Sequence, residues 1–189
     1  MQLTGRQIIG SEFIALGPET FRVCSPATGD ALTPVFHEGC AEEVERALQL
    51  AEEHFDIYRM QDNRQRSHFL ETIVEQLLSL ADPLIERAHL ETALPFGRLE
   101  GELARTVGQV RMFARLVAEG SWTDVRIDHA LPDRQPVPRP DLRSRKIPLG
   151  PVAVFGAANF PLAFSVAGGD TISALAAGCC VIAKGHPAH

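Results

Sequence analysis

Basic residues are in the minority in this sequence, which has 189 residues with 18 Lys and Arg against 24 Asp and Glu, for a formal net charge of -6. A chain with this balance has no broad positive surface for nucleic acid or for anionic lipid headgroups. Arginines do gather in residues 134–146, but prolines interrupt that segment and it contains no aromatic residue. We interpret it as an arm, with a nucleic acid contact as the less favoured alternative.

Long apolar runs are also missing. No stretch of about 18 residues is free of polar breaks, as a membrane helix would require. The longest apolar segment, residues 161–177, is interrupted by Gly168, Gly169 and Asp170. Residues 1–13 lack the basic and apolar regions of a secretory signal. We therefore expect a cytoplasmic protein without a membrane span.

Cysteine is scarce and shows no pattern. The four cysteines form neither a CxxC pair nor a metal-ligand spacing, and they are Cys24, Cys40, Cys179 and Cys180. Two of them are adjacent in an expected strand, where neighbouring side chains point to opposite faces, so they are not a natural disulfide. The sequence predicts reduced thiols and no metal site.

Amphipathic helices make up most of the first 121 residues. Apolar residues recur at helical spacing over residues 41–55 and 64–80, and Asp82 followed by Pro83 predicts the N-cap and first position of a third helix. A longer helix is predicted over residues 98–119, where Gly120 can end it. Its expected apolar stripe consists of Leu99, Leu103, Val107, Val110, Ala114 and Val117. We interpret residues 1–121 as an N-terminal helical part.

Short β segments flank these helices. Residues 5–23 alternate apolar residues with turn signals, which predicts a hairpin-like opening. Residues 122–147 are rich in proline and charge, and their strand candidates at 125–128 and 142–147 are too polar to fill a core. We interpret residues 122–147 as the arm.

The most informative stretch is residues 148–189. A β-branched run at 152–155 is followed by a small-residue turn at 156–159. Pro161 then opens an apolar helix that Gly178 closes, and a second strand is expected at 179–183. This pattern is one βαβ unit. The predicted fold class is therefore α/β, with N-terminal helices followed by the start of a Rossmann-like parallel sheet.

Two polar residues lie where such a unit binds ligands, at the carboxyl ends of its strands. Asn159 is in the turn after the first strand, and Lys184 ends the second. The ordinary alternative is that Asn159 caps the following helix and that Lys184 is solvated. Because the turn lacks a GxGxxG sequence, spacing alone gives the two interpretations about equal weight.

The motifs around these residues resemble the aldehyde dehydrogenase superfamily. They are FGAANFP at 155–161, ALAAG at 174–178 and AKGHPAH at 183–189. This version is most similar to the α-ketoglutarate semialdehyde dehydrogenase branch and to the related NADP-linked fatty aldehyde dehydrogenases. Upstream, ETALPFGRLEGELARTVGQVRMFA resembles the helix that precedes the arm in that branch, so the resemblance covers most of the chain.

The resemblance implies a role for several residues. Asn159 would donate to the oxyanion of the reacting aldehyde, and Phe155, Ala157 and Ala158 would line the cofactor. Lys184 would contact the adenosine ribose. Many NAD-specific members carry a Glu where this chain has Pro187, so Lys184 with His186 could attract a 2′-phosphate, which favours NADP over NAD. Arg105 and Arg111, on the helix that borders the family's substrate tunnel, are weaker candidates for binding a substrate carboxylate.

The resemblance also implies a function. The family oxidises an aldehyde to a carboxylate through a cysteine thiohemiacetal, and the expected substrate here is α-ketoglutarate semialdehyde. The nucleophilic cysteine and general-base glutamate of the family would lie beyond His189, so these residues alone should be inactive. In the family, strands at the place of this arm join the sheet of a neighbouring subunit, so the resemblance implies a homodimer or homotetramer. Two alternatives remain, namely a fatty or aliphatic aldehyde dehydrogenase, and a non-catalytic module for dinucleotide binding or assembly.

Overall fold

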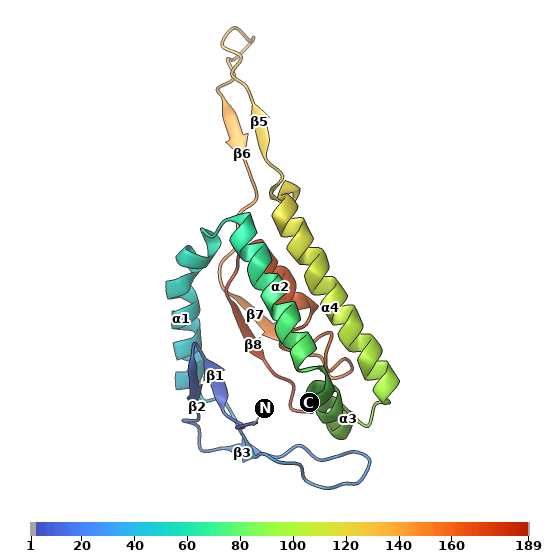
Figure 1. Cartoon of the computed structure of the whole chain (residues 1–189). Helices are drawn as coiled ribbons and strands as arrows, with labels where there is room; N and C mark the ends of the chain where they lie inside the picture. Colours follow the sequence, from blue (N-terminus) through green and yellow to red (C-terminus); the bar gives the residue numbers. More distant parts are fainter. Residues whose placement is uncertain (1–2, 189) are drawn as a thin grey trace.

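Two long helices, α2 (Asn63–Ser79) and α4 (Phe96–Glu119), lie side by side and carry the core in this computed structural model, which describes residues 3–188 (Figure 1). All six residues of the stripe predicted for α4 are buried, and they pack against Leu70 and Val74 of α2. The helix ends as predicted, because Gly120 takes the left-handed conformation with φ 86°.

The connection between α2 and α3 (Ala81–Thr92) corrects one prediction. Asp82 is not the N-cap, since helical backbone already begins at Ala81. Leu80 ends α2 and also starts α3, because its N–H bonds to the carbonyl of Gln76 while its carbonyl accepts from the N–H of Leu84. Pro83 still lies in the first turn, where a missing N–H costs no hydrogen bond.

The N-terminal segment packs beside α1 (Ala41–Arg59). β1 (Gln7–Ile9) pairs antiparallel with β2 (Glu12–Ile14), which confirms the predicted hairpin. A second small ladder joins β3 (Thr20–Phe21) to β4 (Phe36–His37).

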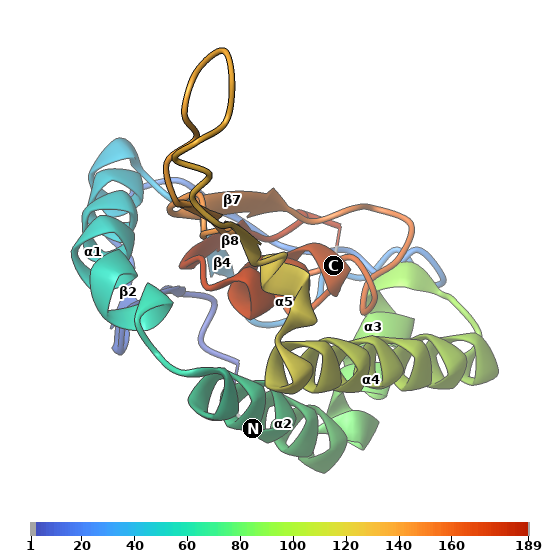
Figure 2. The same ribbon diagram turned by 90° about the horizontal axis from the view of Figure 1, so that it is seen from above.

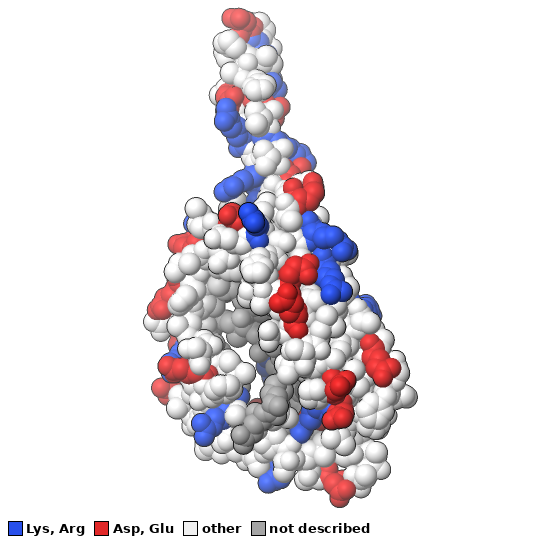
Figure 3. Space-filling view, viewed as in Figure 1, with Lys and Arg blue, Asp and Glu red and all other residues white. Residues whose placement is uncertain are grey.

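A hairpin projects from the end of α4 beyond the body of the molecule (Figure 1). After the short 3-10 helix η1 (Ser121–Thr123), β5 (Arg126–Asp128) pairs antiparallel with β6 (Leu142–Ser144), and all six residues are exposed. Both strand candidates of the arm therefore contain strands, but the second is shorter than predicted, because β6 ends at Ser144. Figure 3 shows Lys and Arg on this arm and on the adjoining end of α4, with Asp and Glu among them.

The last segment forms the predicted βαβ unit. β7 (Val152–Phe155) and β8 (Val181–Lys184) are parallel neighbours, and α5 (Gly169–Ala177) connects them. Figure 2 shows α5 between these strands and the layer of α2 and α4. Ile172 and Ala176 of α5 are buried in the same core as α4. Within residues 3–188, no helix is long and apolar enough to cross a membrane.

Two boundaries of this unit differ from the prediction. The helix begins at Gly169 and not at Pro161, because the chain folds back on itself at Gly168, where a Cβ would lie only 2.5 Å from the Ala163 carbonyl oxygen. The second strand begins at Val181 and not at Cys179, because the Cys179 N–H still bonds to the carbonyl of Ala174 in α5.

Candidate active-site turn

The carboxyl ends of the two parallel strands lie side by side, as the sequence predicts. Phe155 pairs with Lys184, and the Gly156 N–H donates to the Lys184 carbonyl at 3.0 Å. A Cβ on Gly156 would lie 3.2 Å from the backbone nitrogen of His186, so glycine allows the two following turns to pack closely. The exposed Lys184 ammonium donates to the carbonyl of Gly185 at 3.0 Å. Pro187 follows and is exposed.

The chain after β7 closes into a tight loop. The Ala157 N–H donates to the carbonyl of Phe164 at 2.9 Å, and the Phe164 N–H donates to the carbonyl of Phe160 at 3.3 Å. Ala158 and Asn159 are exposed in this loop. We call residues 157–164 the Asn159 loop.

Asn159 does not cap α5, so the capping alternative is wrong. The N-cap of α5 is Gly168. The side-chain amide of Asn159 forms no hydrogen bond with any residue between 3 and 188, while its backbone carbonyl accepts from Arg98 Nη2 at 3.0 Å. The amide group therefore faces solvent and can donate to a ligand.

Glu102 holds the Asn159 loop from α4. Its Oε1 atom accepts from the N–H of Leu162 at 2.8 Å and from the N–H of Ala163 at 2.9 Å, and the side chain is 5% exposed. Sequence reasoning missed this residue. The available signal was its position, because Glu102 is a carboxylate three residues after Leu99 on the apolar stripe of a helix.

Aromatic rings and arginines meet on the outer side of the loop. Phe160 and Phe164 pack edge to face with ring centroids 5.3 Å apart. The Arg98 guanidinium lies 5.2 Å from the centroid of the Phe160 ring, and that of Arg105 lies 5.7 Å and 5.3 Å from the two rings. In the described part of the chain, neither arginine forms an ion pair with a carboxylate.

The two arginines proposed from the sequence therefore differ in position. Arg105 lies over the loop. Arg111 instead lines a separate hollow of about 410 Å³ with Leu78 and Ile85. Arg98, which the sequence did not single out, is the second cation at the loop.

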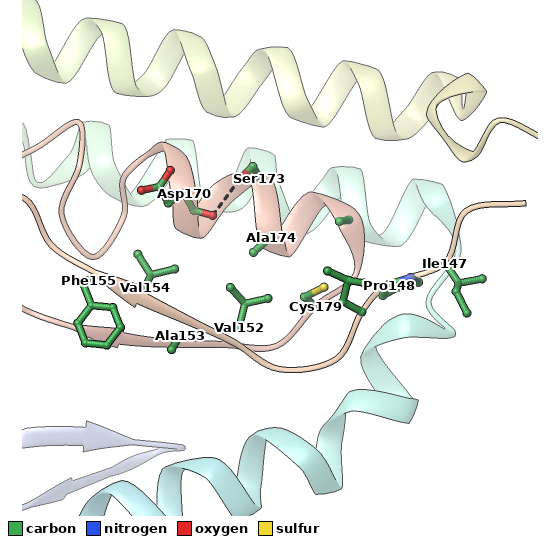
Figure 4. Close-up of a pocket in the computed structure, with 12 residues that line it drawn as sticks. Ile147, Pro148, Val152, Ala153, Val154, Phe155, Asp170, Ser173, Ala174 and Cys179 are labelled. Carbon is green, nitrogen blue, oxygen red and sulfur yellow. Dashed lines mark hydrogen bonds between the residues drawn. The ribbon is translucent and has the colours of Figure 1, made fainter.

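Another hollow, of about 420 Å³, lies beside β7 and α5 (Figure 4). Its lining is mainly apolar and includes Val152, Val154 and Ala174, while Asp170 and Ser173 contribute polar atoms. Of the predicted site residues, only Phe155 lines it. Within residues 3–188, β7 pairs with β8 alone, so this hollow follows an unpaired strand edge.

The four cysteines are free, and Cys180 lacks the surroundings of a nucleophile. Cys179 is buried, and burial together with the neighbouring Cys179 raises the pKa of the Cys180 thiol above its ordinary value. A raised pKa keeps the thiol protonated, whereas a nucleophilic cysteine needs a lowered one.

Among residues 3–188, no group of three or more His, Cys, Asp and Glu side chains is placed to hold a metal ion.

Parallel strands joined by a helix, with a polar turn and a lysine at their carboxyl ends, define the first unit of a Rossmann-like fold of the dinucleotide-binding class. The profile of the aldehyde dehydrogenase family matches residues 13–189, and the chain belongs to this family.

Relatives and solved structures agree with this assignment. The chain is 55% identical over its whole length to α-ketoglutaric semialdehyde dehydrogenase 2 of Azospirillum brasilense, and it covers 36% of that protein. It is 45% identical to α-ketoglutaric semialdehyde dehydrogenase of Acinetobacter baylyi, with 98% of this chain and 35% of the relative covered. A betaine aldehyde dehydrogenase double mutant from Staphylococcus aureus, solved in complex with NAD+, has the same fold with a TM-score of 0.83 at 22% identity, over 96% of this chain and 35% of that one. The chain thus spans about a third of the length of these proteins.

Proposed function

We propose that these residues form the N-terminal part of an enzyme that oxidises α-ketoglutarate semialdehyde to α-ketoglutarate with a nicotinamide cofactor. The single observation that carries the proposal is the exposed amide of Asn159, which no capping bond occupies, at the carboxyl end of β7. Membership of the aldehyde dehydrogenase family supports the reaction, and the names of the two relatives at 55% and 45% identity support the substrate.

In the proposed mechanism a cysteine thiolate, from a part of the enzyme outside these residues, adds to the aldehyde carbon. The carbonyl oxygen then becomes an oxyanion, to which the Asn159 amide donates a hydrogen bond without adding a titrating group. Collapse of this intermediate expels a hydride, which the nicotinamide accepts when bound, and water releases the acid from the thioester. The role of Asn159 is thus to stabilise the charge that develops on oxygen.

The strand ends of this chain fit a dinucleotide. Gly156 lets the backbone turns approach each other closely, and the Lys184 ammonium is exposed beside them. Phe155, Ala157 and Ala158 would contact the cofactor from the first turn. With Pro187 where a carboxylate would accept both ribose hydroxyls, nothing at that position repels a 2′-phosphate, and Lys184 with His186 would attract one. We therefore propose NADP as the preferred cofactor.

Arg98 and Arg105 support a substrate with a carboxylate. Both guanidiniums lie over phenylalanine rings next to Asn159, and no carboxylate within the described residues neutralises them. A guanidinium can pair with a carboxylate through two parallel hydrogen bonds. A semialdehyde of a keto acid carries such a group at the end remote from the aldehyde, whereas a fatty aldehyde does not.

The arm and the hollow beside β7 are surfaces that the rest of the enzyme would cover. We propose that β5 and β6 join a neighbouring subunit in a homodimer or homotetramer in the cytoplasm. We also propose that further strands of the sheet pair with the free edge of β7, because an exposed parallel edge is rarely left unpaired.

The test is an assay of the complete polypeptide with NADP and with NAD, on α-ketoglutarate semialdehyde and on a long-chain aldehyde. We expect the semialdehyde with NADP to give the highest kcat/KM, and the variant Arg105→Met to raise KM for the semialdehyde more than for the fatty aldehyde. Arg111→Met, on the same helix but away from the loop, is the matched control. A preference for the long-chain aldehyde would mean that the enzyme is a fatty aldehyde dehydrogenase. Dinucleotide binding without oxidation of any aldehyde would favour a non-catalytic binding module.

A further inference from the structure

The Asn159 loop begins like a helix but is capped from elsewhere. The first N–H groups of a helical turn have no partner within the turn, and a nearby Ser, Thr, Asp or Asn side chain commonly accepts from them. The carbonyl of Phe160 accepts the first hydrogen bond of this turn, so Phe160 is at the cap position, and its side chain has no acceptor. The adjacent Asn159 amide does not take the role either. The N–H groups of Leu162 and Ala163 instead donate to Glu102 Oε1, which lies on α4, 60 and 61 residues away in sequence.

The helix that supplies this acceptor also holds the other end of the loop. Arg98 is one turn before Glu102 on α4, and its guanidinium bonds to the Asn159 carbonyl. Both contacts come from α4, which the core holds in place, since its Leu99 and Val110 are fully buried. α4 therefore fixes the backbone at Asn159 and again three and four residues after it.

We propose that Glu102 is a positioning residue for the reaction. By capping the turn at residues 160–164 it satisfies the N–H groups that the nearby Asn159 side chain could otherwise accept from, and it leaves the Asn159 amide free and aimed at the reacting oxygen. This inference rests on the proposed function, because it gives Asn159 the oxyanion. Glu102 itself touches neither substrate nor cofactor.

The replacement of Glu102 should therefore act through Asn159. Glu102→Leu keeps the size of a buried side chain but removes the acceptor, and the freed turn would draw the Asn159 amide into a capping bond. A small misplacement of a catalytic group can cost about 100-fold in rate, so we expect kcat to fall at least about tenfold with a small change in KM. Glu102→Gln retains a carbonyl oxygen in reach of both N–H groups and should stay within about threefold of wild type. Glu102→Asp, which is one methylene too short, should lie between them.

A double-mutant cycle in the complete polypeptide separates this role from a merely structural one. In the Asn159→Ala background, Glu102→Leu should change kcat by less than about twofold, because the group through which it acts is gone. If Glu102 only stabilised the fold, Glu102→Leu would cause the same loss of kcat with and without Asn159, and that result would overturn the proposal. Glu100→Ala, two residues earlier on the exposed side of α4, is the matched control and should leave kcat unchanged.

Hydrogen exchange gives a readout that does not depend on activity. In wild type, the amides of Leu162 and Ala163 should be protected, and Glu102→Asp should expose them while Glu102→Gln does not. If the complete polypeptide oxidises no aldehyde but this protection is found, the proposed function fails and the cap stands. Unprotected amides in an active enzyme would overturn the positioning role. Because hydrogen exchange compares wild type with Glu102→Asp and Glu102→Gln, it tests the proposal even if Glu102→Leu fails to fold.

Discussion

Removal of the Glu43 carboxylate should destabilise the protein, and by an amount that depends on pH. Glu43 is 2% exposed in the first turn of α1. Its Oε2 accepts from the N–H of Cys40 at 2.9 Å, which completes a capping box, and its Oε1 accepts from the N–H of Leu16 at 3.0 Å. One carboxylate thus ties the start of α1 to the segment that follows β2.

The expected magnitude follows from the two bonds. A cap contributes about 1 kcal/mol, and a buried N–H left without an acceptor costs about 1 to 3 kcal/mol. Glu43→Ala should therefore lower the free energy of unfolding by about 2 to 4 kcal/mol near neutral pH. Glu42→Ala, in the same turn but exposed, should change it by less than about 0.5 kcal/mol.

The direction of the pH dependence comes from the lowered pKa. The hydrogen bond from the Cys40 N–H, and then that from Leu16, lower the pKa of the Glu43 carboxyl below its ordinary value of 4.5, against the opposing effect of burial. A lowered pKa in the folded state gives stability that is full above the ordinary value and is lost as pH falls through the lowered one.

Urea unfolding of wild type and of both variants at pH 7, 5 and 3.5 tests this reasoning. The difference between wild type and Glu43→Ala should be similar at pH 7 and 5 and smaller at pH 3.5. A difference that is constant over this range, or that grows in acid, would refute the role of the charged carboxylate.

Two further changes test the packing around α5. Tyr58 donates to the Leu175 carbonyl at 2.9 Å, and burial raises its pKa to about 12. Tyr58→Phe should lower the free energy of unfolding by about 1 kcal/mol. An ultraviolet difference titration between wild type and variant should show the Tyr58 ionisation near pH 12, and a midpoint near pH 10 would contradict the burial. Gly178 has φ 95°, and a Cβ there would lie 2.9 Å from Pro148 Cγ. Gly178→Ala should therefore destabilise the protein more than Gly29→Ala, where φ is also positive but no atom lies within 4 Å; equal losses would mean that the close contact relaxes.

Local patterns in the sequence were enough to predict most of the fold. The buried stripe of α4, its end at Gly120 and the strand at residues 152–155 are confirmed, because each depends on neighbours within a few residues along the chain. The hairpin at the N-terminus and the two strands of the arm are confirmed for the same reason.

The predictions failed where a distant residue decides the local structure. A helix was expected to begin at Pro161, but the chain makes only a single turn there, which Glu102 caps from α4, and then reverses at Gly168. Periodicity cannot reveal an acceptor that lies 60 residues away. The same limit separates Arg105 from Arg111, since only the packing of α4 against the Asn159 loop decides which arginine faces it.

The most direct test of the central claim is the steady-state oxidation of α-ketoglutarate semialdehyde with NADP by the complete polypeptide and by its Asn159→Ala variant. If the Asn159 amide stabilises the oxyanion, kcat should fall by about 100-fold or more, while the affinity for NADP stays the same. An Asn159→Ala enzyme that keeps the wild-type kcat would contradict the account.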